Sequence, residues 1–155
     1  LDQARAGKAR IHYGATASHG GMRAMSMNQF AAQRAKWQQT DDLGFEVYNT
    51  ARYAQIKDPE EYTLLAATLE RGLREGAIGL GLAPQYYPGA SREEIFRVYQ
   101  MAARWKVPVF THVRSMTPDA FQEALANAAS TGPARSRVSP VVRTISVTRS
   151  RGRCR

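Results

Sequence analysis

The sequence has few of the residues that cross-link a chain or bind metals: its 155 residues include one cysteine and three histidines. The single cysteine, Cys154, excludes an intrachain disulfide and a cysteine-rich metal site. No apolar run approaches the roughly 18 residues of a membrane span. No charged segment followed by an apolar one marks a signal peptide after Leu1. We therefore expect a cytoplasmic protein that does not enter the membrane.

Acidic residues are absent from residues 133–155, which contain seven arginines. Most of the net charge of +9 belongs to this tail. One interpretation is a basic arm for nucleic acid or an acidic membrane, although the tail has no aromatic side chains to stack on bases. A disordered tail is another. We favour a reading-frame shift near residues 131–133, because the composition changes abruptly there. The expected parts are thus a folded body, 1–132, and a basic tail of low order, 133–155.

The body alternates segments that are typical of strands and helices. Residues 77–82 and 107–112 are apolar runs whose starts lie 30 residues apart, the length of one β/α unit. The second run has the composition of a parallel strand buried on both faces. A complete barrel of such units needs about 250 residues. The sequence therefore predicts an α/β fold, a partial (β/α)8 TIM barrel of about three units with parallel strands.

Helices are predicted from caps and apolar periodicity. The clearest one begins at Asp58-Pro59 and carries an apolar stripe that ends at Leu73. Ser91 and Glu94 have the spacing of a capping box at the start of the next helix. These two helices, 59–75 and 92–105, should lie on one outer face of the sheet, since crossovers between parallel strands are right-handed.

The remaining elements follow the same alternation. A further helix begins at Thr117-Pro118, with three apolar residues expected to face inward: Phe121, Leu125 and Ala128. The other expected elements are a strand at 9–14, a loop of small residues at 15–21, and helices at 22–39 and 44–53.

His112 stands at the end of the predicted strand 107–112, where the reactive groups of β/α barrels lie. A neutral imidazole there binds zinc well, and Arg114 lies two residues on, on the same side of the strand. The alternative is a histidine hydrogen-bonded at the barrel rim. Catalytic zinc takes three protein ligands. The other histidines are His12, in mid-strand and interpreted as structural, and His19, in the loop 15–21.

Loop residues supply the other candidates. Residues 16–20 resemble a nucleophile elbow but lack its first glycine, so a serine hydrolase is not expected. Tyr86 and Tyr87, followed by Pro88-Gly89, form either an ordinary turn or a wall of a substrate pocket at the catalytic face of a barrel.

Several segments resemble, in order, the motifs of one enzyme family: ARIHYGA at 9–15 with SHG at 18–20, ERGLREGAIG at 70–79, YPGAS at 87–91 and FTHVR at 110–114. Together they resemble the N-acyl-D-amino-acid deacylases, the D-aminoacylase and D-glutamate deacylase branch of the amidohydrolase superfamily. The resemblance covers roughly residues 1–130. It implies a zinc-dependent β/α barrel that hydrolyses the amide bond of a small-molecule N-acyl-D-amino acid, with His112 as a metal ligand.

The candidate substrate-binding residues are those at the predicted strand ends and loops: Arg114, Tyr86, Tyr87 and His19. The resemblance leaves the catalytic residues unassigned, because the family's His-x-His strand, metal-binding cysteine and late catalytic aspartate have no match here. We therefore expect a fragment from the middle of a barrel, inactive by itself and prone to self-association through unpaired strand edges. Two alternatives stay open: another amidohydrolase that acts on cyclic amides, and a non-catalytic basic binding module that uses the tail.

Overall fold

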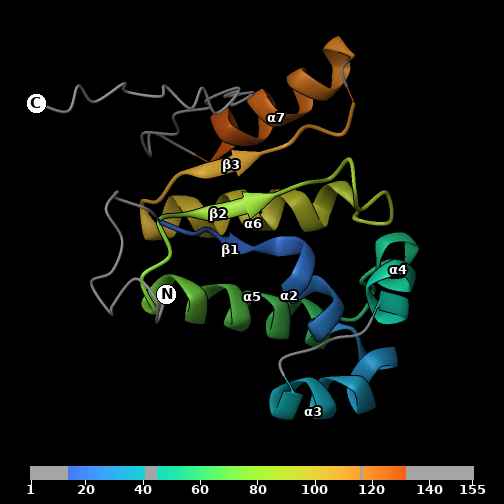
Figure 1. The fold of residues 1–155 in the computed structure, drawn as a ribbon. Helices are drawn as coiled ribbons and strands as arrows, with labels where there is room; N and C mark the ends of the chain where they lie inside the picture. Colours follow the sequence, from blue (N-terminus) through green and yellow to red (C-terminus); the bar gives the residue numbers. More distant parts are fainter. Residues whose placement is uncertain (1–13, 41–44, 116, 132–155) are drawn as a thin grey trace, which may run out of the picture.

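The computed structural model describes residues 14–40, 45–115 and 117–131, and these form a mixed α/β fold that is mostly helical (Figure 1). A small parallel sheet of three strands lies at its centre, in the order β1-β2-β3. The strands are β1 (Ala17–Ser18), β2 (Leu80–Leu82) and β3 (Val109–Thr111). The predicted strand 9–14, apart from its last residue, and the tail 133–155 lie outside the described residues, as does His12.

Two predicted strands, 77–82 and 107–112, are confirmed as parallel neighbours, although both are shorter than expected. Gly79 explains how closely they approach, since a Cβ on this residue would collide with the Pro108 carbonyl oxygen. The predicted loop 15–21 is wrong, because it contains β1 and the start of a helix. Ala17 is buried there against Gly72, whose missing side chain makes room for it.

The described residues also form helices and a 3-10 turn: α2 (His19–Ser26), η1 (Asn28–Phe30), α3 (Ala31–Thr40), α4 (Phe45–Tyr53), α5 (Pro59–Arg74), α6 (Arg92–Trp105) and α7 (Pro118–Ser130). The helices predicted at 44–53, 59–75 and 92–105 are confirmed. None of the described helices is long and apolar enough to cross a membrane.

The single helix predicted at 22–39 is wrong, because the chain breaks at Met27. This residue has extended backbone angles (φ −73°, ψ 130°) and a buried side chain. The next amide, that of Asn28, donates a hydrogen bond to Glu61 Oε1 at 2.7 Å. The break thus places Met27 in the core, and Glu61 supplies an acceptor for a donor that the start of the new turn leaves unpaired.

Helix caps follow the sequence with one exception. Asp58 and Glu61 form a capping box at the start of α5. At the start of α6, Ser91 Oγ accepts a hydrogen bond from the Glu94 amide at 3.0 Å. The predicted reciprocal hydrogen bond, in which the Glu94 carboxylate accepts from the Ser91 amide, is wrong, since that carboxylate binds His19 and Arg23. Helix α6 therefore keeps only the serine half of its box.

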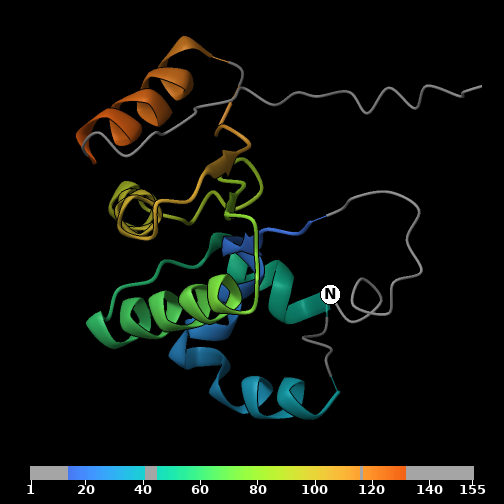
Figure 2. The same ribbon diagram turned by 90° about the vertical axis from the view of Figure 1, so that its left-hand side faces the viewer.

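Helices α5, α6 and α7 lie on the same side of the sheet, as Figure 2 shows, which agrees with the expectation for 59–75 and 92–105. The core between helices and sheet is apolar and includes Leu69, Leu80, Leu82 and Val98, each at most 2% exposed. The predicted inward face of α7 is wrong for Phe121 and Leu125, which are 37% and 53% exposed. Small residues face inward instead: Ala120, Ala124 and Ala128.

Because the strands are parallel, their carboxyl ends meet at one edge of the sheet, termed here the carboxyl edge. At this edge β1 is followed directly by α2, β2 by the β2–α6 loop (residues 83–90), and β3 by His112. Helix α4 lies beside the same edge (Figure 1).

Candidate functional site

His112 is exposed at the carboxyl edge, directly after β3. Its backbone amide donates a hydrogen bond to the Leu82 carbonyl at 2.8 Å, which continues the pairing of β2 with β3 beyond the strands. The imidazole lies against the ring of Tyr86, with 5.1 Å between ring centroids and a tilt of 51°. The structure therefore brings together two of the predicted site residues on one accessible surface.

The β2–α6 loop that carries Tyr86 is held by α4. Arg52 Nε donates to the Tyr86 carbonyl at 2.8 Å, and the Gly89 amide donates to the Arg52 carbonyl at 2.9 Å. A Cβ on Gly89 would collide with the Tyr53 and Ala54 backbone, so only glycine fits where the loop crosses the end of α4. Arg52 was not singled out in the sequence, since its partner is a backbone atom 34 residues away.

Behind this surface lies a cluster of three charged or polar side chains without solvent exposure, His19, Arg23 and Glu94, termed the buried charge cluster. His19 Nε2 lies 2.8 Å from Glu94 Oε1, and Arg23 Nε donates to the same oxygen at 2.6 Å. His19 is therefore not on the accessible surface next to His112. Its Nδ1 is buried and has no hydrogen-bond partner among the described residues.

Two opposing effects set the ionisation of Glu94. Burial alone would raise the pKa of its carboxyl, but the hydrogen bonds and charges of His19 and Arg23 outweigh burial and lower that pKa below its usual 4.5. The carboxylate is thus an acceptor only, so His19 Nε2 carries the donated proton. Glu94 thereby fixes the orientation of the His19 ring.

Arg23 connects the cluster to α4. Its two terminal nitrogens donate to the carbonyls of Ala51 and Ala54, at and just after the carboxyl end of that helix. These carbonyls have no partner within a helix, and a cation is favourable beside them. The guanidinium thus has a carboxylate on one side and a helix end on the other.

Tyr87 packs on the cluster from the β2–α6 loop. Its ring meets the His19 ring edge to face, with centroids 6.4 Å apart, and lies over Gly20, where a Cβ would collide with it. Its hydroxyl donates to the Tyr48 hydroxyl. Burial and this hydrogen bond raise the pKa of Tyr87. Tyr87 is thus a buried packing residue, whereas its neighbour Tyr86 is 49% exposed.

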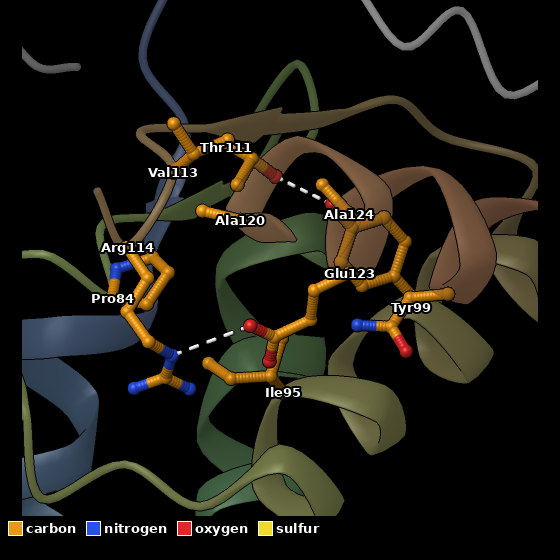
Figure 3. Close-up of a pocket in the computed structure, with 10 residues that line it drawn as sticks. Pro84, Ile95, Tyr99, Thr111, Val113, Arg114, Ala120, Glu123 and Ala124 are labelled. Atoms are coloured by element: carbon orange, nitrogen blue, oxygen red, sulfur yellow. Dashed lines mark hydrogen bonds and ion pairs between the residues drawn. The ribbon is translucent and has the colours of Figure 1, made fainter. Parts of the chain in front are cut away.

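Arg114 lies on the other side of the loop and is already paired. Its Nε lies 3.4 Å from Glu123 Oε2, and Nη2 donates to the Ala90 carbonyl at 3.1 Å. The residue borders a narrow pocket between the end of β3, α6 and α7 (Figure 3). There Glu123 Oε1 and the Asn127 side-chain nitrogen are buried without a hydrogen-bond partner in the described part of the chain.

The described residues do not fit a complete zinc centre. Within residues 14–40, 45–115 and 117–131, no three histidine, cysteine, aspartate or glutamate side chains lie close enough to hold a metal ion. Of the two described histidines, His112 is exposed and His19 is committed to Glu94. Among the described histidines, His112 alone can therefore supply a ligand to a metal ion.

Comparison with models of known protein families, with curated proteins and with solved structures found no significant match.

Proposed function

We propose that this chain carries part of a metal-dependent amidohydrolase that hydrolyses the amide bond of N-acyl-D-amino acids. The observation that carries the proposal is His112: an exposed imidazole directly after the parallel strand β3, in the segment FTHVR, with the Tyr86 ring beside it. Reactive groups of β/α barrels lie at this edge of the sheet. The ordered motifs that resemble those of the deacylases give the proposed substrate class.

The arrangement of the sheet supports a partial (β/α)8 barrel as the finer fold. Strand order follows chain order, and α5, α6 and α7 lie on one side of the sheet. A doubly wound sheet instead has helices on both faces and a reversal of strand order where its ligand binds. Three consecutive strands with their helices on one side therefore fit a segment of barrel wall.

In the proposed enzyme, bound zinc would polarise the amide carbonyl and activate water. His112 would be one of its three protein ligands, and the others would come from outside the described residues. The residues described here have supporting roles: Tyr86 covers one side of the imidazole, and Glu123 holds Arg114 beside the β2–α6 loop.

The first test is zinc binding by the purified chain. A single histidine binds zinc weakly, so we expect substoichiometric metal and no deacylase activity. Zinc titration should shift the NMR signals of the His112 imidazole, whereas those of buried His19 stay in place as an internal control. Tightly held zinc at one equivalent, with activity that His112→Ala abolishes, would show a complete enzyme and contradict the assignment as a fragment.

The second test uses a longer protein that contains this chain, assayed on N-acetyl-D-glutamate, other N-acyl-D-amino acids and cyclic amides. Hydrolysis of the N-acyl-D-amino acids, lost in His112→Ala, is the expected result. Hydrolysis of cyclic amides alone would favour the other amidohydrolase class.

The seven arginines of the tail favour a second candidate, a basic binding module. Binding to DNA that weakens with salt and disappears when residues 133–155 are deleted would support it.

A further inference from the structure

We propose that Glu94 is a positioning residue for His112: through the buried charge cluster it fixes the β2–α6 loop, and the loop holds the Tyr86 ring against the His112 imidazole. Glu94 itself lies on α6 with its carboxylate bound to His19 and Arg23. The importance of Glu94 for catalysis rests on the proposed function, whereas its structural connection to His112 does not.

The first step runs from Glu94 to α4 through Arg23. The carboxylate binds Arg23 Nε at 2.6 Å, and the two terminal nitrogens bind the Ala51 and Ala54 carbonyls. Since all of these groups are hydrogen-bonded to one buried guanidinium, a shift of Arg23 also shifts the end of α4. Without the carboxylate, the guanidinium would be buried with a charge that nothing neutralises.

The second step runs from Glu94 to the loop through His19. The hydrogen bond to Nε2 fixes the plane of the His19 ring, and the Tyr87 ring packs edge to face on that plane. Gly20 leaves the space that Tyr87 fills, and the Tyr48 hydroxyl on α4 accepts a hydrogen bond from the Tyr87 hydroxyl. Tyr87 is therefore held both by the cluster and by α4.

The third step joins both routes at Tyr86. Its carbonyl accepts the hydrogen bond from Arg52 on α4, and its neighbour in the chain is Tyr87. Tyr86 has half its surface exposed, so the backbone anchors of the loop hold its ring beside His112. Loss of the Glu94 charge should therefore be detected at His112, although the Glu94 carboxylate forms its hydrogen bonds with His19 and Arg23 and not with the His112 ring.

The test records the His112 imidazole proton shifts by NMR in the full chain, without metal or substrate. Tyr86→Leu defines the shift that the tyrosine ring causes. Glu94→Gln, which keeps the size of the side chain and removes its charge, should move the His112 signals most of the way to the Tyr86→Leu values. Glu93→Gln is the matched control and should leave them in place, because Glu93 is exposed and pairs with Arg97 on its own helix.

A control for general destabilisation is Leu69→Ala, which opens the core at α5 and removes no hydrogen-bonding group of the cluster or the loop. Unchanged His112 signals in Glu94→Gln, or an equal movement in Leu69→Ala, would overturn the proposal.

If Glu94→Gln does not fold, a second variant is Arg52→Met, at a half-buried residue. It removes the hydrogen bond from Arg52 to the Tyr86 carbonyl and should move the His112 signals, with exposed Arg71→Met as its control. Unchanged signals in Arg52→Met would also overturn it. Zinc plays no part in these measurements, so their failure is separate from failure of the proposed function.

Discussion

Glu94 shows how a residue with an ordinary local role can have a distant one. It stands three residues after Ser91, where a glutamate usually folds back on the helix start, yet its carboxylate reaches His19 and Arg23, more than 70 residues earlier in the chain. Only its backbone amide keeps the local capping bond. The carboxylate instead neutralises a fully buried arginine.

The first prediction is the cost of removing that charge. Glu94→Gln leaves Arg23 buried without a counter-charge, so it should lower the free energy of unfolding by about 3–5 kcal/mol. Its exposed neighbour Glu93 provides the comparison. Glu93→Gln should change the free energy of unfolding by no more than about 0.5 kcal/mol. Urea unfolding followed by circular dichroism measures both. Equal losses in the two variants would show that the buried pair contributes nothing beyond a surface one.

The second prediction concerns acid. The pKa of Glu94 is lowered in the folded state, so its stabilisation is complete above the ordinary value of 4.5 and is lost as the pH falls through the lower folded value. The stability gap between the wild type and Glu94→Gln should therefore narrow between about pH 7 and about pH 3. Urea unfolding across this range measures the gap. A constant gap would mean that the carboxylate ionises alike in the folded and unfolded chain.

At the scale of the element, α2 contains adjacent glycines in different surroundings. A Cβ on Gly20 would collide with the Tyr87 ring, whereas one on Gly21 meets nothing closer than Ser18 Oγ at 4.0 Å. Gly20→Ala should therefore lose about 1–3 kcal/mol of stability through overpacking. Gly21→Ala should gain about 0.5–1 kcal/mol, since alanine is the better helix former. Thermal unfolding of the two variants checks this, and a stabilised Gly20→Ala would show that Tyr87 moves aside freely.

Helices and strands could be predicted from the sequence where the apolar spacing and the capping residues indicated the same element. In α5, the pattern Leu65, Leu69 and Leu73 repeats at helical spacing, and the cap at Asp58-Pro59 sets the start, so sequence and structure coincide. The parallel pairing of β2 with β3 was also predictable, because a helix of suitable length separates two apolar runs.

Other features depend on distant partners and leave no local signal. Met27 looks like a helical residue, but Glu61 on another helix supplies the acceptor at the break. In α7, the large apolar side chains of Phe121 and Leu125 were expected to face the core. The small residues do so instead: Ala120, Ala124 and Ala128. Of the candidate site, the places of His112 after β3 and of Tyr86 in the loop after β2 were anticipated, whereas the contact between their rings was not. The burial of His19 was not, since its partner is 75 residues away.

At the scale of the molecule, an apolar surface on α7 predicts self-association. Leu125 is 53% exposed and Phe121 37%, on the helix that follows the edge strand β3. Leu125→Lys should lower the association measured by sedimentation velocity, with stability changed by no more than about 0.5 kcal/mol. Gln100→Lys adds the same charge on the exposed face of α6 and is the control. Equal effects of the two lysines would assign the change to net charge alone.

The order of the strands has a consequence for how the protein is made. In the described part of the chain, β2 pairs with β1 and β3 pairs with β2, so no later strand of the three has to insert between two earlier ones. During synthesis, β1 and β2 can pair with α5 packed against them before β3 leaves the ribosome. Each newly made unit then finds its docking surface already formed, and folding can proceed in the direction of translation.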